Sequence, residues 1–243
     1  MTHVYWLEQR VSDVPVEDDW LSDRELRHLQ DLRFTKRRTD WRLGRWTAKK
    51  ALTDLCGFGS GRQSLARIEI RAAPSGVPEV FVDGDPASST ISLSHRDGLS
   101  ACALASDQMA LGCDLERIEP RSIAFIGDYF TEGEQELIAS GNTDLLATLL
   151  WSAKESALKA LHVGLTADTR SVVVSIEDDV LTFAAAGTSL WGRLRVQDSN
   201  HRILRGFWQA AGSFVRTMVA DPPVREIVVM SSPQPATVSV RSD

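Results

Sequence analysis

The chain has 243 residues, of which 43% are hydrophobic, and a formal net charge of −6. It is long enough to bury a full core in one domain or two small ones, and its acidic balance argues against a nucleic-acid-binding protein. No apolar stretch has membrane-spanning length and the N-terminus has no signal-like pattern, so we expect a cytoplasmic protein without membrane association.

The first part of the sequence predicts two helices followed by short strands. Ser22 and Glu25 form a capping box that opens the first helix. A longer helix is expected over residues 37–55, because a broad apolar stripe precedes Gly57, where a helix should stop. Turn-rich segments then separate strand candidates at residues 68–71, 80–82, 91–94, 99–105 and 110–115.

The same order returns after residue 115. Ser122 can cap a helical turn, Thr131 and Glu134 form a second capping box, and residues 144–161 have a long helical period. Strand candidates follow at residues 171–176, 180–184, 190–196, 203–209, 214–220 and 226–230.

This repeated order predicts an α+β fold with two pseudo-symmetric halves. A weak echo between residues 98–107 and 212–221 agrees, although a glycine turn before a strand is common. We divide the chain into an N-terminal half (1–111), a C-terminal half (112–230) and a loose polar tail (231–243). Each half is expected to pack a small antiparallel sheet against helices, with the active site in the cleft between the halves.

Two short blocks carry most of the functional signal. In GCDLE, at residues 112–116, Asp114 and Glu116 share one face of a strand and can bind one cation. In WSAKESALK, which ends at Lys159, Glu155 stands four residues earlier and projects from the same side of a helix. Hard Mg²⁺ binds a few carboxylates and leaves positions for water and substrate phosphates. The blocks together favour a magnesium and phosphate site.

Each block alone also has an ordinary explanation. An acidic pair at a strand end is usually solvated, and a Glu–Lys pair four residues apart stabilises a surface helix by only about 0.2–0.5 kcal/mol. The two blocks in this order make those explanations weaker than a shared site.

The blocks resemble the signatures of the 4′-phosphopantetheinyl transferase superfamily, Gly-x-Asp-x-Glu and Trp/Phe-Ser/Cys-x-Lys-Glu-Ser/Ala-x-x-Lys, at every defining position. The stretch from Leu93 to His95 is similar to a Ser-His block of that family. LGRWTAK, which ends at Lys49, is similar to its Leu-Gly-Arg-x-x-Ala-Lys pattern. Residues 74–78 are similar to a Gly-Lys-Pro turn, with Val77 where the family often has lysine. The chain length resembles the larger, monomeric, pseudo-dimeric class that activates surfactin synthetase.

The resemblance implies an enzyme that transfers 4′-phosphopantetheine from coenzyme A to a serine of an apo acyl or peptidyl carrier protein, as in secondary metabolite biosynthesis, and releases 3′,5′-ADP. It implies that Asp114, Glu116 and Glu155 bind Mg²⁺ or Mn²⁺. It further implies a catalytic role for Glu155 as candidate base and for Lys159 and His95 as phosphate-stabilising groups.

Coenzyme A binding is implied for a second set of residues. Lys49 is the first candidate for the 3′-phosphate with Arg38 as a helper, whereas Arg45 is expected to be structural. Ser94, His95, Lys154 and Lys159 complete the expected coenzyme A contacts, with Lys154 facing either the 3′-phosphate or solvent.

A carrier-docking surface is also expected just after the acidic pair. Its arginines would meet an acidic carrier, and the alternative is that they are solvated while the aromatic residues belong to the core. The surface comprises Arg117, Arg121, Ile123, Phe125, Ile126, Tyr129 and Phe130.

Two other functions remain open. A different magnesium-dependent enzyme that cleaves pyrophosphate would turn over without a carrier protein. A catalytically inactive module that binds coenzyme A or a carrier is the second alternative, and the intact set Asp114, Glu116, Glu155 and Lys159 argues against it.

Overall fold

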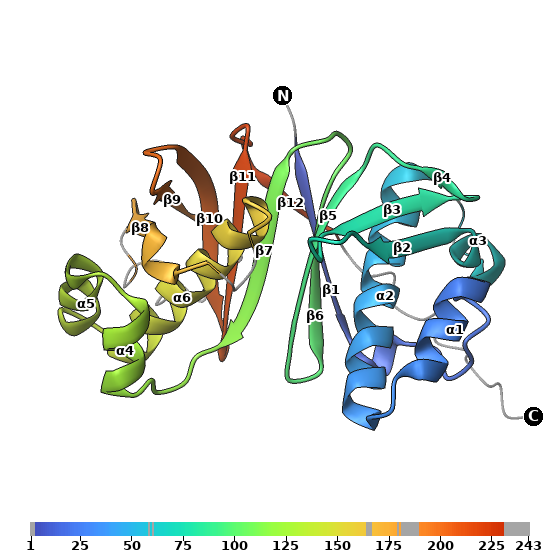
Figure 1. Cartoon of the computed structure of the whole chain (residues 1–243), viewed down its shortest axis with the longest axis horizontal. Coiled ribbons are helices and arrows are strands. Elements are labelled where there is room, and N and C mark those ends of the chain that lie inside the picture. The colour runs from blue at the N-terminus through green and yellow to red at the C-terminus, as the bar shows by residue number, and fades with distance from the viewer. Residues whose placement is uncertain are drawn as a thin grey trace, which may run out of the picture.

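The computed structural model describes residues 3–230 except residues 58, 60, 164–166, 179 and 181–189. The described part has the α+β fold expected from the sequence, with two groups of sheets and helices on either side of the molecule (Figure 1). No helix in this part is long and apolar enough to cross a membrane. The predicted tail and most of the predicted strand 180–184 lie outside the described residues.

Two sheets and three helices form the first group. The four-stranded sheet has the order β12-β1-β6-β5, and the three-stranded sheet has the order β2-β3-β4. The strands are β1 (Val4–Arg10), β2 (Ile68–Ala72), β3 (Pro78–Val82), β4 (Asp85–Pro86), β5 (Thr90–Arg96), β6 (Leu99–Ala105) and β12 (Ile227–Val229). The helices are α1 (Asp23–Asp31), α2 (Thr35–Cys56) and α3 (Arg62–Ala66), after a 3-10 turn η1 (Val11–Asp13).

One antiparallel sheet and three helices form the second group. The sheet has the order β7-β11-β10-β9-β8, and α6 packs against β7 and β11. Its strands are β7 (Ala110–Arg117), β8 (Val172–Ile176), β9 (Gly192–Asp198), β10 (Ile203–Ala211) and β11 (Phe214–Asp221). Its helices are α4 (Ile123–Tyr129), α5 (Glu132–Ala139) and α6 (Thr143–Ala160), and a 3-10 turn η3 (Thr169–Ser171) precedes β8.

The predicted helix boundaries are confirmed at the caps. Ser22 accepts a hydrogen bond from the Glu25 backbone at the start of α1, and the Thr131–Glu134 capping box opens α5. Gly57 ends α2 in the left-handed conformation, with φ of 69°. Local hydrogen bonding thus sets the helix ends that the sequence predicts.

The last strand departs from the predicted division of the chain. We expected residues 226–230 in the C-terminal half, but β12 pairs in parallel with β1, with Val4 opposite Ile227 and Trp6 opposite Val229. The outer edge of β1 needs hydrogen-bond partners for its backbone groups, and β12 provides them. The end of the described chain therefore returns to the first group of sheets.

Close packing of α6 on β7 explains the glycine of the GCDLE block. A Cβ atom at Gly112 would lie only 1.8 Å from the backbone oxygen of Ser156. Next to this contact, the hydroxyl groups of Ser152 and Ser156 on α6 lie 2.8 and 2.7 Å, respectively, from the hydroxyl group of Thr217 on β11. This approach brings the α6 side chains to the strand that carries the acidic pair.

Candidate functional site

Three elements meet at Asp114, which lies on β7. Ser94 Oγ, from β5, donates a hydrogen bond to Asp114 Oδ1 at 2.8 Å, and Lys159 Nζ, from α6, donates to the same oxygen at 2.9 Å. Lys159 also donates to the Cys113 carbonyl at 2.8 Å. The second carboxylate oxygen, Asp114 Oδ2, is buried and has no hydrogen-bond partner in the described structure. Asp114 Oδ2 is therefore available to bind a cation or to accept a hydrogen bond.

The three predicted carboxylates influence one another. Burial and then the charge of Asp114 raise the pKa of Glu155 to about 7, although Lys159 lowers it. Burial and Asp114 also raise the pKa of Glu116, against the effects of two arginines and a hydrogen bond from Trp151. The charge of Asp114 thus makes ionisation of Glu116 and Glu155 less favourable, a condition that a bound cation would relieve.

Glu116 forms ion pairs with two arginines. Arg96 and Arg121 approach its Oε2 atom at 3.6 and 3.5 Å, and both also pair with Glu119, at 2.7 and 3.4 Å. Within the described ranges, no three Asp, Glu, His or Cys side chains are grouped ready to hold a metal ion. The donor chemistry nevertheless fits a hard divalent cation, because the available ligands are carboxylate oxygens and Asp114 Oδ2 is unpartnered.

A cavity of about 420 Å³ opens beside Lys159, within the size range of small-molecule sites. The predicted turn forms one wall, and Gly76 takes a φ of 85°, which favours glycine at that position. Apolar and cationic side chains share the lining, which includes Arg45, Arg71, Gly76, Val77, Pro78, Ile91, Leu93, Leu111, Lys159 and His162.

Lys49 does not face this cavity, which corrects the sequence prediction. Its side chain is fully buried, pairs with Glu25 and donates to the Trp20 carbonyl at 3.1 Å. Burial lowers its pKa, although Glu25 raises it. Because Glu25 also accepts from the backbone of Ser22 and Ile70, the pair ties α1, α2 and β2 together. Its role is structural.

Lys154 and Arg38 are likewise structural. Lys154 Nζ is buried, pairs with Glu134 at 2.9 Å and donates to the carbonyls of Thr169 and Val172 at 2.9 and 2.6 Å. Arg38 donates to the Leu29 and Leu32 carbonyls at 2.8 and 3.4 Å, at the end of α1. The positions of Lys154 and Arg38 therefore do not support their predicted contacts with coenzyme A.

Arg45 and His162 line the cavity instead. We expected Arg45 to be structural, and its Nε atom does form a 3.8 Å ion pair with Glu25, although it has no hydrogen-bond partner in the described residues. Its guanidinium lies 4.9 Å from the Trp41 ring centroid, and the side chain also lines the cavity. His162 follows α6 with φ of 59°. Its position three residues after Lys159 was the sequence signal for a second side chain near that lysine.

His95 remains close to the charged groups. Its half-exposed ring lies 3.8 Å from Asp40 of α2. Burial lowers its pKa, Asp40 raises it, and Lys36 and Lys159 lower it. The contact with Asp40 places the His95 ring beside α2.

The expected docking surface divides into exposed and buried residues. Ile123 is 91% exposed and Tyr129 is 38% exposed, whereas Phe130 is buried in the core and is removed from the surface. Phe125 packs against Trp151 with ring centroids 5.0 Å apart. Arg117 pairs with Asp97 at 3.2 Å, and Arg121 pairs with Glu116.

Residues 110–200 match the family model described as the 4′-phosphopantetheinyl transferase superfamily. This segment belongs to that superfamily. It contains both signature blocks, so the resemblance found in the sequence is confirmed. Membership indicates a transferase that acts in phosphopantetheine transfer. No curated protein matches the chain.

Proposed function

We propose that this superfamily member transfers 4′-phosphopantetheine from coenzyme A to a serine of an apo acyl or peptidyl carrier protein and releases 3′,5′-ADP. The observation that carries this proposal is the position of Lys159. Its ammonium group contacts Asp114 and lines the cavity, with 30% of its side chain exposed. A cation beside a buried carboxylate and a ligand-sized cavity suits a substrate that carries a diphosphate.

A divalent cation, Mg²⁺ or Mn²⁺, would be held by Asp114, Glu155 and Glu116. The support is the unpartnered Asp114 Oδ2 and the raised pKa values of Glu155 and Glu116, which burial and the charge of Asp114 cause. When bound, such a cation withdraws charge from the diphosphate. For Glu116 to take part, its carboxylate must leave Arg96 and Arg121.

Coenzyme A is proposed to occupy the cavity with its diphosphate toward Lys159. Apolar walls from Ile91 and Leu93 suit a flat base, and Arg45 provides an anion-binding group. The turn offers Val77 where a lysine would add a phosphate contact. Arg45 is proposed as the compensating cation because it lines the cavity, where its Nε atom also forms a 3.8 Å ion pair with Glu25.

The reaction breaks the bond between the β-phosphorus and the 3′,5′-ADP oxygen while the carrier serine oxygen bonds to that phosphorus. The serine proton passes to Glu155, the candidate base, directly or through a water. Lys159 stabilises the charge on the phosphate oxygens, and His95 is proposed to assist from the rim.

We also propose the class of the protein within the superfamily. Both sheet groups occur in one chain, and each packs a long helix, α2 or α6, against its sheet. This supports a monomer with two pseudo-symmetric halves and an active site between them, as in the larger class. The three cysteines are unpaired, which suits the reducing cytoplasm.

The test combines product analysis with substitutions. Wild-type protein with coenzyme A, Mg²⁺ and an apo carrier should release 3′,5′-ADP, and Lys159→Met should lower the rate strongly. Arg37→Gln is a matched control on the exposed start of α2. Release of 3′,5′-ADP without a carrier would support a pyrophosphate-cleaving enzyme instead, and coenzyme A binding without turnover would support an inactive module.

A further inference from the structure

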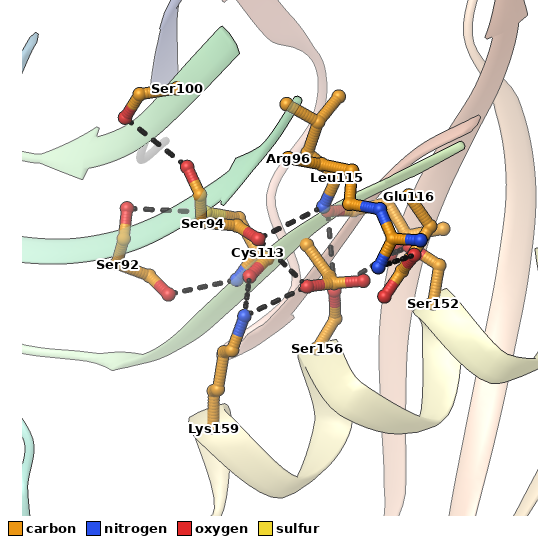
Figure 2. A network of polar contacts seen from close by, with 12 residues as sticks. Ser92, Ser94, Arg96, Ser100, Cys113, Leu115, Glu116, Ser152, Ser156 and Lys159 are labelled. Atoms are coloured by element: carbon orange, nitrogen blue, oxygen red, sulfur yellow. Dashed lines mark hydrogen bonds and ion pairs between the residues drawn. The ribbon is translucent and has the colours of Figure 1, made fainter. Parts of the chain in front are cut away.

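Ser92 and Ser94 join two sheets that share no backbone ladder. Their strand β5 is the last of one sheet, and β7 is the first of another. The backbone N–H groups of Cys113 and Leu115 on β7 donate to Ser92 Oγ and Ser94 Oγ, at 2.9 and 3.2 Å (Figure 2). The hydroxyls take the place of the carbonyls of a neighbouring strand.

The bond from Leu115 fixes the direction of the Ser94 proton. A hydroxyl has one proton to donate and also accepts, so Ser94 accepts from the Leu115 N–H and donates its proton to Asp114 Oδ1. Ser94 is buried, with 8% of its surface exposed, so water hardly competes for these bonds. Lys159 Nζ donates to the same Oδ1 atom.

The two donors distinguish the oxygens of Asp114. Oδ1 receives both hydrogen bonds, whereas Oδ2 is buried and receives none. Loss of the Ser94 hydroxyl would leave the carboxylate held from one side, by Lys159. The direction of Oδ2 would then be less well defined.

We propose that Ser94 is a positioning residue that holds Asp114 with Oδ2 free for the cation, a role beyond the coenzyme A contact that the family resemblance implied. This inference rests on the proposed function, because it assumes that Asp114 is a cation ligand. Ser92 is a natural control, because its hydroxyl accepts the same kind of bond from β7, from the Cys113 N–H, but donates no hydrogen bond to Asp114 in the described residues.

The test measures Mn²⁺ binding by electron paramagnetic resonance without coenzyme A, in Ser94→Ala, Ser94→Cys and Ser92→Ala. We expect Ser94→Ala to bind Mn²⁺ about tenfold more weakly, as losing a hydrogen bond to a metal ligand typically does. Ser94→Cys keeps a weaker hydrogen-bond donor, so its Mn²⁺ affinity should lie between those of Ser94→Ala and wild type. If Ser94→Ala does not fold, Ser94→Cys alone tests the inference. Ser92→Ala should bind Mn²⁺ like wild type.

Two results would overturn the inference. The first is wild-type Mn²⁺ affinity in Ser94→Ala or Ser94→Cys, with or without weaker coenzyme A binding. The second is an equal loss in the Ser92 and Ser94 variants, which would indicate a role in joining the sheets only. Asp114→Asn separates this inference from the proposed function: if it also binds Mn²⁺ normally, the cation site itself is wrong.

Discussion

Replacement of Glu155 by glutamine should stabilise the metal-free protein at alkaline pH. The carboxyl is 9% exposed and lies near Asp114, so burial and repulsion oppose its ionisation. Glutamine keeps the shape of the side chain but cannot ionise. In the presence of a chelator, the variant therefore lacks a charge that the folded state disfavours.

The size of the effect follows from the pKa. A rise from 4.5 to about 7 corresponds to about 3 kcal/mol, and screening by solvent, because the carboxyl is not fully buried, reduces this to about 1–2 kcal/mol. At pH 4 the carboxyl is protonated in both states, so it costs nothing. As the pH rises from 4.5 through 7, the unfolded chain releases the proton first, and the free energy of unfolding falls. The full penalty is present at pH 8.

Urea unfolding in chelator at pH 4.5 and pH 8 measures this difference. Glu155→Gln should exceed wild type in free energy of unfolding at pH 8 and equal it at pH 4.5, and excess Mg²⁺ should stabilise wild type more than the variant. Glu136→Gln, at an exposed position on α5, is the control and should show no such dependence. Equal stability of Glu155→Gln and wild type at both pH values would refute the reasoning.

Three further substitutions test other parts of the structure. Lys154→Met leaves Glu134 buried without its partner and should lower the free energy of unfolding by about 3–5 kcal/mol in urea; a loss below 1 kcal/mol would contradict the structural role. Gly112→Ala places a Cβ against Ser156 and should cost about 1–3 kcal/mol, with a lower melting temperature; an unchanged melting temperature would contradict the close packing of α6 on β7. Arg45→Gln should raise the Kd for coenzyme A about tenfold in calorimetry, equivalent to about 1.4 kcal/mol; unchanged affinity would remove Arg45 from the site.

Local features of the sequence predicted the fold well. The Ser22 and Thr131 caps depend on residues three positions away, so a sequence pattern contains the whole interaction. The pairing of β12 with β1 joins opposite ends of the described chain. No local pattern encodes that choice, so the predicted division of the chain missed it.

The candidate site was predictable where spacing sets geometry. Glu155 and Lys159 lie four residues apart on α6, and both are near Asp114: Lys159 donates a hydrogen bond to it, and the charge of Asp114 raises the pKa of Glu155. The lysine assignments failed because a residue type does not reveal a distant partner. The carboxylate that pairs with the buried Lys49 belongs to Glu25, on another helix. That Arg45 lines the cavity is likewise decided by tertiary packing.

The central proposal is tested most directly by the intact mass of apo carrier proteins after incubation with the enzyme, coenzyme A and Mg²⁺. We expect at least one acyl or peptidyl carrier to gain the mass of one 4′-phosphopantetheine group. Its Ser→Ala form should gain none. If a folded enzyme that binds coenzyme A modifies no member of a broad carrier panel, the proposed transfer is contradicted.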